Sequence, residues 1–153
     1  MLVERVQHTV ARLILATEAE YEAGGTQGFV EYPRRGIAGL DTAFRATKGT
    51  GDLRLSFCAE YDALPDVGHA CGHNIIAASS LGAAIGLAEV ADEIDASVVV
   101  FGTPCEEGGG GKVDIINAGF FSDIHASMMV HPWPTERLAA TCLAVVTFDV
   151  TFH

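Results

Sequence analysis

The feature that most constrains the fold is the apolar run Ala96–Phe101, which contains Val98, Val99 and Val100 in succession. Consecutive β-branched residues favour an extended strand, and a strand without polar alternation has to be covered on both faces. Such strands are typical of parallel sheets with helices packed on either side. The run therefore predicts a buried, parallel strand of an α/β protein.

The rest of the chain alternates between helical and extended patterns. We expect helices over Val3–Ala23, Asn74–Val90 and Val113–Ala118, strands over Gly28–Tyr32, Ala43–Thr47, Leu53–Ala59, Ala126–Val130 and Leu143–Phe152, and turns over Pro33–Leu40 and Gly108–Gly111. The helix Asn74–Val90 and the strand Ala126–Val130 are expected to be buried. This order predicts a three-layer α/β sandwich around a mixed, mainly parallel sheet, in which ligands bind at the carboxyl ends of the strands.

Composition and charge limit the binding partners and the cellular compartment that we expect for this protein. The 153 residues include 9 Lys and Arg against 20 Asp and Glu, and the net charge of −11 argues against nucleic acid or an anionic membrane as a partner. No apolar run reaches the roughly 18–20 residues of a membrane span. Glu4 and Arg5 stand where the apolar core of a signal peptide would begin. We therefore expect a cytoplasmic protein whose cysteines are thiols.

Polar clusters come after three of the predicted strands. They are Glu60–Asn74 after the first, Gly102–Gly108 after the second and His131-Pro132 after the third. Strand ends of a parallel sheet converge at one edge, so these clusters are expected to share a site.

The residue types in these clusters are those of a metal centre. Thiolate, imidazole and carboxylate are the usual zinc ligands, and Gly72 lets Cys71 and His73 turn toward one point. The adjacent carboxylates Glu106 and Glu107 repel each other, and a cation relieves that repulsion. One of the two would then bind metal while its neighbour acts as a base on water.

Each of these signals has an ordinary structural explanation. A lone histidine or cysteine in an apolar α/β protein is more often a core or surface residue than a ligand, and Glu-Glu before glycines is often a solvated turn. The combination favours metal binding for Cys71, His73, Glu107 and His131. We expect His69 to donate a structural hydrogen bond, His125 to be exposed and Cys58 to be a small core residue.

The motifs AEYDALPDVGHACGHN (59–74), GTPCEEGGGGK (102–112) and MMVHP (128–132) resemble those of the M20 metallopeptidases. The forms CGHN and GTPxEEGG are similar to the branch of p-aminobenzoyl-glutamate hydrolases and Xaa-Arg dipeptidases. The resemblance covers the chain from about Gly36 onward. It implies a zinc-peptidase-like catalytic domain that hydrolyses an amide bond with two divalent metal ions, of which zinc suits a thiolate ligand best, with manganese, cobalt or nickel as alternatives.

The resemblance also implies roles for single residues. Cys71 would bind metal, bridging two ions, and His73, Glu107 and His131 would be further ligands. Glu106 would be the general base and later the acid toward the leaving amine. Asp62 would orient a ligand.

Two departures from the family pattern shape the expected domain organisation. Leu2–Gly28 fits poorly to the HxxPELxxxE-like segment with which members typically open. The smaller lid domain, which usually dimerises, and a last histidine ligand would come after Phe152. We therefore expect residues 1–153 to be a partial catalytic domain, inactive alone, that forms an oligomer or associates with the remainder of the enzyme.

The sequence leaves three hypotheses of function open. The first is a hydrolase of N-acyl amino acids or dipeptide-like substrates, with Glu106 as base. The second is a non-catalytic metal-binding or partner-subunit fragment of such an enzyme. The third is a cysteine hydrolase that uses Cys71 with His73 or His69.

Overall fold

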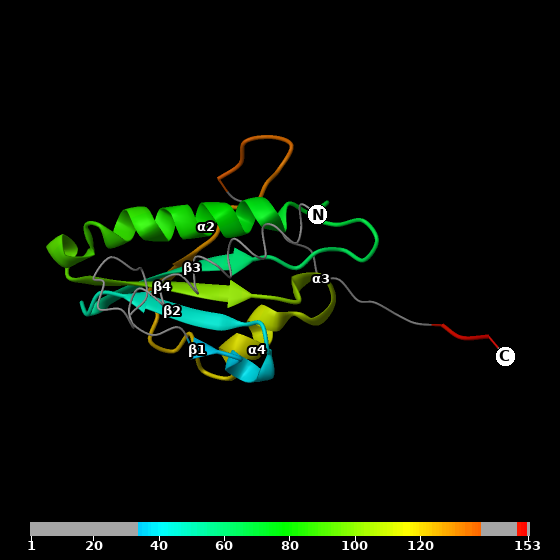
Figure 1. Cartoon of the computed structure of the whole chain (residues 1–153), viewed down its shortest axis with the longest axis horizontal. Coiled ribbons are helices and arrows are strands. Elements are labelled where there is room, and N and C mark those ends of the chain that lie inside the picture. Colours follow the sequence, from blue (N-terminus) through cyan, green and yellow to red (C-terminus); the bar gives the residue numbers. More distant parts are fainter. Residues whose placement is uncertain (1–33, 139–149, 153) are drawn as a thin grey trace, which may run out of the picture.

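The computed structural model describes residues 34–138 and 150–152, and a five-stranded open sheet lies at its centre (Figure 1). The strands are β1 (Arg34–Arg35), β2 (Phe44–Lys48), β3 (Leu53–Glu60), β4 (Ala96–Thr103) and β5 (Ala126–Met128), in the order β1-β2-β4-β3-β5. β3 runs parallel to both β4 and β5, whereas β2 is antiparallel to β4 and to β1. The predicted mixed, mainly parallel α/β sheet is confirmed.

The apolar run around Val98–Val100 forms β4, and its side chains pack on both faces of the sheet. Val98 and Val100 belong to one core cluster, which packs under α2 (His73–Ala88). Val99 and Phe101 belong to the other, with Ile115 of α4 (Gly111–Asn117). Alternate side chains of a strand point to opposite faces, so a strand between two layers is apolar throughout. All of β4 is buried, as predicted.

The helix α2 is less buried than its apolar sequence predicts. Its buried face consists of His73, Ile76, Ala77, Ser80 and Ala84. Ile75 and Ile85, however, are exposed by 56% and 40%. A sequence rich in Ala, Leu and Ile with few polar breaks predicts a buried helix, but among the described residues α2 packs mainly against β3 and β4. A short 3-10 helix, η2 (Ala91–Ile94), connects α2 to β4.

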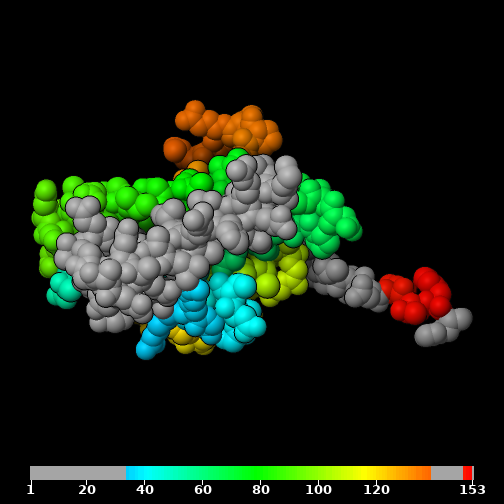
Figure 2. All heavy atoms as spheres, in the orientation of Figure 1, coloured from blue at the N-terminus to red at the C-terminus, as the bar shows by residue number. Residues whose placement is uncertain are grey.

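The strand β5 corrects a second expectation, because Ala126–Met128 is exposed rather than buried. It lies at the end of the described sheet and pairs only along Leu55–Phe57 of β3. Its start is fixed to β3 by His125: the His125 amide donates to the Arg54 carbonyl at 2.9 Å, and the Arg54 amide donates to His125 Nδ1 at 3.0 Å. The chain after β5 projects beyond α2 (Figure 2).

The turn-rich segments contain short regular elements. Pro33–Leu40 includes β1 and the 3-10 helix η1 (Ile37–Gly39), and Glu106–Gly109 forms the one-turn helix α3, which takes up part of the expected turn Gly108–Gly111. The helix predicted at Val113–Ala118 is α4, shifted by two residues at its start. The elements expected at Val3–Ala23 and Gly28–Tyr32 lie outside the described residues, as does most of Leu143–Phe152. No helix in the described ranges is long and apolar enough to cross a membrane.

We predict that Gly102→Ala destabilises the fold. A Cβ at Gly102 would lie 2.0 Å from Cε1 of the buried Phe44 ring on the neighbouring strand. Overpacking of this kind costs about 1–3 kcal/mol. Gly82→Ala is the matched control, because a Cβ there meets nothing within 4 Å. In the interior of α2, that change is expected to stabilise by about 0.5–1 kcal/mol. Urea unfolding of both variants measures the difference, and equal midpoints would contradict the packing described here.

Candidate metal centre

The three polar clusters meet at one edge of the sheet. Glu60 is the last residue of β3 and pairs in register with Thr103, the last residue of β4. α3 begins at Glu106, just beyond β4, and His131 comes three residues after β5. Because β3, β4 and β5 are parallel, their carboxyl ends open on the same side. The sequence-based expectation that the clusters share an edge is confirmed.

His73 occupies the middle of the site as the first residue of α2, and it is only 2% exposed. Its Nδ1 lies 2.9 Å from the Asp62 carbonyl oxygen and 3.0 Å from Asp62 Oδ1. Since a carbonyl only accepts, Nδ1 donates to Asp62, and Nε2 is the ring nitrogen left to face the centre of the site. Nε2 faces three carboxylates, at 3.4 Å from Glu60 Oε2, 3.6 Å from Glu107 Oε1 and 3.7 Å from Glu106 Oε2.

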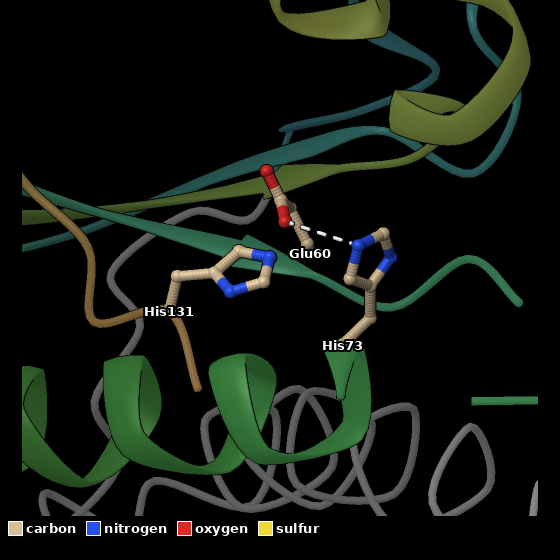
Figure 3. Close-up of side chains that lie close together, drawn as sticks. All are labelled: Glu60, His73 and His131. Carbon is tan, nitrogen blue, oxygen red and sulfur yellow. Dashed lines mark ion pairs between the residues drawn. The ribbon is translucent and has the colours of Figure 1, made fainter. Parts of the chain in front are cut away.

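His131 approaches from the other side in the same way. Its Nδ1 lies 2.8 Å from the Pro132 carbonyl oxygen, so Nδ1 donates and Nε2 is the nitrogen left for the site. The His131 and His73 rings lie 6.3 Å apart between centroids and are nearly perpendicular, at 88°. The two rings and the Glu60 carboxylate turn toward a common space (Figure 3).

Glu60 is a member of the site that the sequence analysis did not single out. It is 1% exposed, Lys112 binds its Oε1, and its buried Oε2 has no hydrogen-bond partner among the described residues. Unpaired buried oxygens are rare in folded proteins, because losing water without a replacement costs free energy. The available signal was positional: Glu60 is a charged residue that directly follows the apolar residues Phe57–Ala59 at the end of β3.

Two sets of side chains have ligand atoms within 4.8 Å of one another, Glu60 with His73 and His131, and His73 with Glu106 and Glu107. His73 belongs to both sets. Imidazole nitrogens and carboxylate oxygens are common zinc ligands. Three carboxylates crowd around the His73 ring, and Glu60 Oε2 has no hydrogen-bond partner among the described residues. A divalent cation would satisfy both conditions, so the residues present fit a metal centre.

Cys71 belongs to neither set, although it lies beside one of them. The Glu107 carboxylate accepts a hydrogen bond from the Cys71 thiol, and together with burial and the nearby negative charges this raises the thiol pKa to about 11. A bound cation acts in the opposite direction and favours the thiolate. The expected role of Cys71 as a ligand therefore stays a prediction.

Asp62 connects two parts of the site. Besides its contacts with His73, its Oδ2 accepts a hydrogen bond from the Glu107 amide at 3.1 Å. It thus holds the start of α2 to the start of α3. Glu106 is more open, with its side chain 45% exposed, and reaches the same His73 nitrogen from the solvent side.

His69 departs from the expectation that it makes a structural hydrogen bond. Both ring nitrogens are buried, and neither has a hydrogen-bond partner among the described residues. The bond in its turn is made by the backbone instead, since the Gly72 amide donates to the His69 carbonyl at 3.1 Å. Cys58 is buried, and His125 is exposed, as expected.

The sheet, the covering helices and the ligand-rich edge define an α/β fold with a candidate metal centre at the carboxyl ends of its parallel strands. Residues 41–152 match peptidase family M20/M25/M40, and the chain belongs to this family. It is 45% identical over 124 residues to the Xaa-Arg dipeptidase of Mus musculus, covering 74% of this chain and 28% of the relative. It is 30% identical over 117 residues to a subunit of the p-aminobenzoyl-glutamate hydrolase of Escherichia coli K12, covering 64% of this chain and 24% of that subunit.

Solved structures agree with the sequence relatives. A dinuclear metal-binding peptidase of family M20 from Bacillus subtilis superimposes with a TM-score of 0.59 at 25% identity, covering 82% of this chain and 36% of that one. The chain therefore spans between a quarter and two fifths of the lengths of these proteins. The resemblance proposed from the motifs is confirmed at the level of the family and the fold.

We predict that Gly72→Ala weakens metal binding. Gly72 has φ +81°, and a Cβ there would lie 2.7 Å from Cγ of Pro132, the neighbour of His131. The substitution therefore pushes the His131 segment away from His73. Gly119→Ala is the control, since Gly119 has φ +83° and nothing within 4 Å of its added Cβ. Both variants lose about 1–2 kcal/mol of stability to the left-handed backbone. Only Gly72→Ala is expected to bind zinc more weakly in calorimetric titration.

Proposed function

We propose that this chain provides the metal-binding part of a hydrolase that cleaves the amide bond of a dipeptide-like or N-acyl amino acid substrate. The observation that carries the proposal is the convergence of His73, His131 and the unpaired Glu60 oxygen at the carboxyl edge of the sheet. The similarity to proteins named as a dipeptidase and as an amide hydrolase supports the reaction class. Of the two, the Xaa-Arg dipeptidase is the more similar, which favours a dipeptide with a C-terminal basic residue.

His73, His131, Glu107 and Cys71 are proposed to hold the metal, in agreement with the assignment made from the motifs. Two divalent cations in this place would polarise the scissile carbonyl and lower the pKa of water. Imidazole and thiolate donors suit zinc better than manganese or magnesium. Zinc is therefore the proposed metal.

Three carboxylates of the chain are proposed to have different roles in orienting a ligand, transferring protons and binding the metal. Asp62 Oδ1 accepts a hydrogen bond from His73 Nδ1 and so keeps Nε2 directed at the centre. Glu106, the more exposed of the adjacent pair, is proposed to accept a proton from the attacking water and to return it to the departing nitrogen. Glu107 is held in place by the hydrogen bond that its backbone amide donates to Asp62 Oδ2, which suits a ligand rather than a group that moves protons.

The second candidate is a fragment that binds metal without catalysing hydrolysis. The observation that favours it is length, because the chain spans 28% of the Xaa-Arg dipeptidase. Residues that complete the site in such relatives then come from another part of the protein or from an associated subunit. Homo-oligomerisation and a cytoplasmic location are likewise proposals. The described cysteines, Cys58, Cys71 and Cys105, are free thiols, which suits a reducing compartment.

The geometry favours neither His73 nor His69 as the base for a Cys71 nucleophile. The Cys71 thiol bonds to a carboxylate, and its pKa is raised to about 11. An activated cysteine needs a lowered pKa and an imidazole as its partner. The metal-dependent hydrolase is therefore favoured over a thiol hydrolase.

We predict that Glu106→Gln in the zinc-loaded protein abolishes most of the turnover but leaves the metal in place. The amide cannot take up a proton, so kcat for dipeptides ending in arginine should fall by about 10²–10⁴-fold. Zinc content by elemental analysis should match that of the unchanged protein. Glu93→Gln is the control, because Glu93 lies in η2, beyond the opposite end of α2. Full turnover by Glu106→Gln would refute the assigned base. Appreciable turnover by the unchanged chain alone would refute the non-catalytic candidate.

A further inference from the structure

The pair formed by Glu60 and Lys112 lies directly beneath the candidate metal centre. Glu60 ends β3, Lys112 is the second residue of α4, and the Lys112 ammonium binds Glu60 Oε1. The carboxylate is 1% exposed, whereas the lysine side chain is 30% exposed. The lysine thus approaches from the outer side, and among the described residues only Oε1 of the carboxylate accepts a hydrogen bond.

The other oxygen faces the imidazoles. Glu60 Oε2 lies 3.4 Å from His73 Nε2 and forms one ligand set with His73 and His131. Both rings use Nδ1 for hydrogen bonds, to Asp62 and to the Pro132 carbonyl, so Nε2 of each ring is the nitrogen left for a metal ion. One potential ligand atom from each of Glu60, His73 and His131 lies within 4.8 Å of the others. That arrangement suits a cation and leaves an oxygen unsatisfied otherwise.

The glycine run before Lys112 explains how the lysine reaches this place. Gly110 has φ +66°, which lets the chain turn directly from α3 into α4. Gly111 is buried, and a Cβ there would lie 2.1 Å from the Pro104 carbonyl oxygen. α4 therefore starts in contact with the segment after β4, and its second residue falls next to the end of β3. From the sequence, this glycine run is expected only to form a turn. In the structure it brings the Lys112 ammonium to the Glu60 carboxylate.

We infer that Glu60 is an additional carboxylate ligand of the metal centre and that Lys112 is its positioning residue, fixing Oε1 so that Oε2 faces His73 and His131. The inference rests on the proposed metal-dependent function but adds two residues to it. Lys112 also offsets one of the negative charges gathered at His73. It does so without entering the space between the rings, because it binds the far oxygen of the carboxylate.

Zinc titration by calorimetry tests the inference on the chain as it stands. Lys112→Met frees the carboxylate to rotate, and Glu60→Gln removes its charge. Each is expected to weaken zinc binding about 10–100-fold, the usual effect of losing a group that orients a ligand. Lys112→Arg keeps a cation in place and should retain most of the affinity. Lys48→Met is the matched control, since Lys48 lies at the opposite end of the sheet, paired with Val98.

The double variant Glu60→Gln/Lys112→Met separates the inference from a purely structural role. If Lys112 acts through Glu60, the double variant should bind zinc no more weakly than Glu60→Gln alone. It also avoids a buried unpaired charge, so it keeps the test valid where Lys112→Met alone does not fold. Additive losses in the double variant would overturn the inference. So would zinc affinity in Lys112→Met equal to that in Lys48→Met, with only the unfolding midpoint lowered. Absence of zinc binding in the unchanged chain would instead overturn the proposed metal centre itself.

Discussion

The parallel pairing of β3 with β4 is the interaction on which the rest of the structure depends. Eight residue pairs in register, from Leu53 with Ala96 to Glu60 with Thr103, bring the ends of both strands to the same level. The segments that leave the two strands are thereby forced into one neighbourhood: Asp62 and His73 after β3, and the carboxylates of α3 after β4. Because β4 is covered on both faces, all of its residues are buried, whereas β3 is buried from Ser56 to Glu60.

Repulsion between the carboxylates at that edge favours the binding of a cation by the site. Glu60, Asp62, Glu106 and Glu107 surround one imidazole, and the ion pairs of the described residues bring only Lys112 to balance them. Negative charges this close make it more costly for each carboxyl group to stay ionised unless a cation intervenes. The pKa of the Cys71 thiol is raised chiefly by its hydrogen bond to Glu107, and the neighbouring carboxylates act in the same direction. A site of this kind binds divalent metal at the expense of protons, which links metal affinity to pH.

Two turns with positive φ angles bring the segments that follow the strand ends together at the site. Gly72 takes φ +81° and lets Pro132 approach, so that the chain after β5 lies against the start of α2. Cys105 takes φ +62° immediately before Glu106, a conformation that residues with a Cβ rarely adopt. Such a residue commonly marks a functional turn, and here it directs α3 toward His73. The site is therefore built from turns that are held in place by the rigid sheet.

The sequence by itself determined the layers, the strands that carry the site and the ligand types, because β-branched runs and metal-binding motifs are local signals. Only the tertiary structure decided that Glu60 faces the imidazoles, that Lys112 meets it across 52 residues of chain, and that β5 is an exposed edge. The sequence analysis missed Glu60 because a carboxylate at a strand end looks the same whether it faces solvent or a ligand. Its pairing depends on where α4 packs, and burial depends on neighbours that no local pattern specifies.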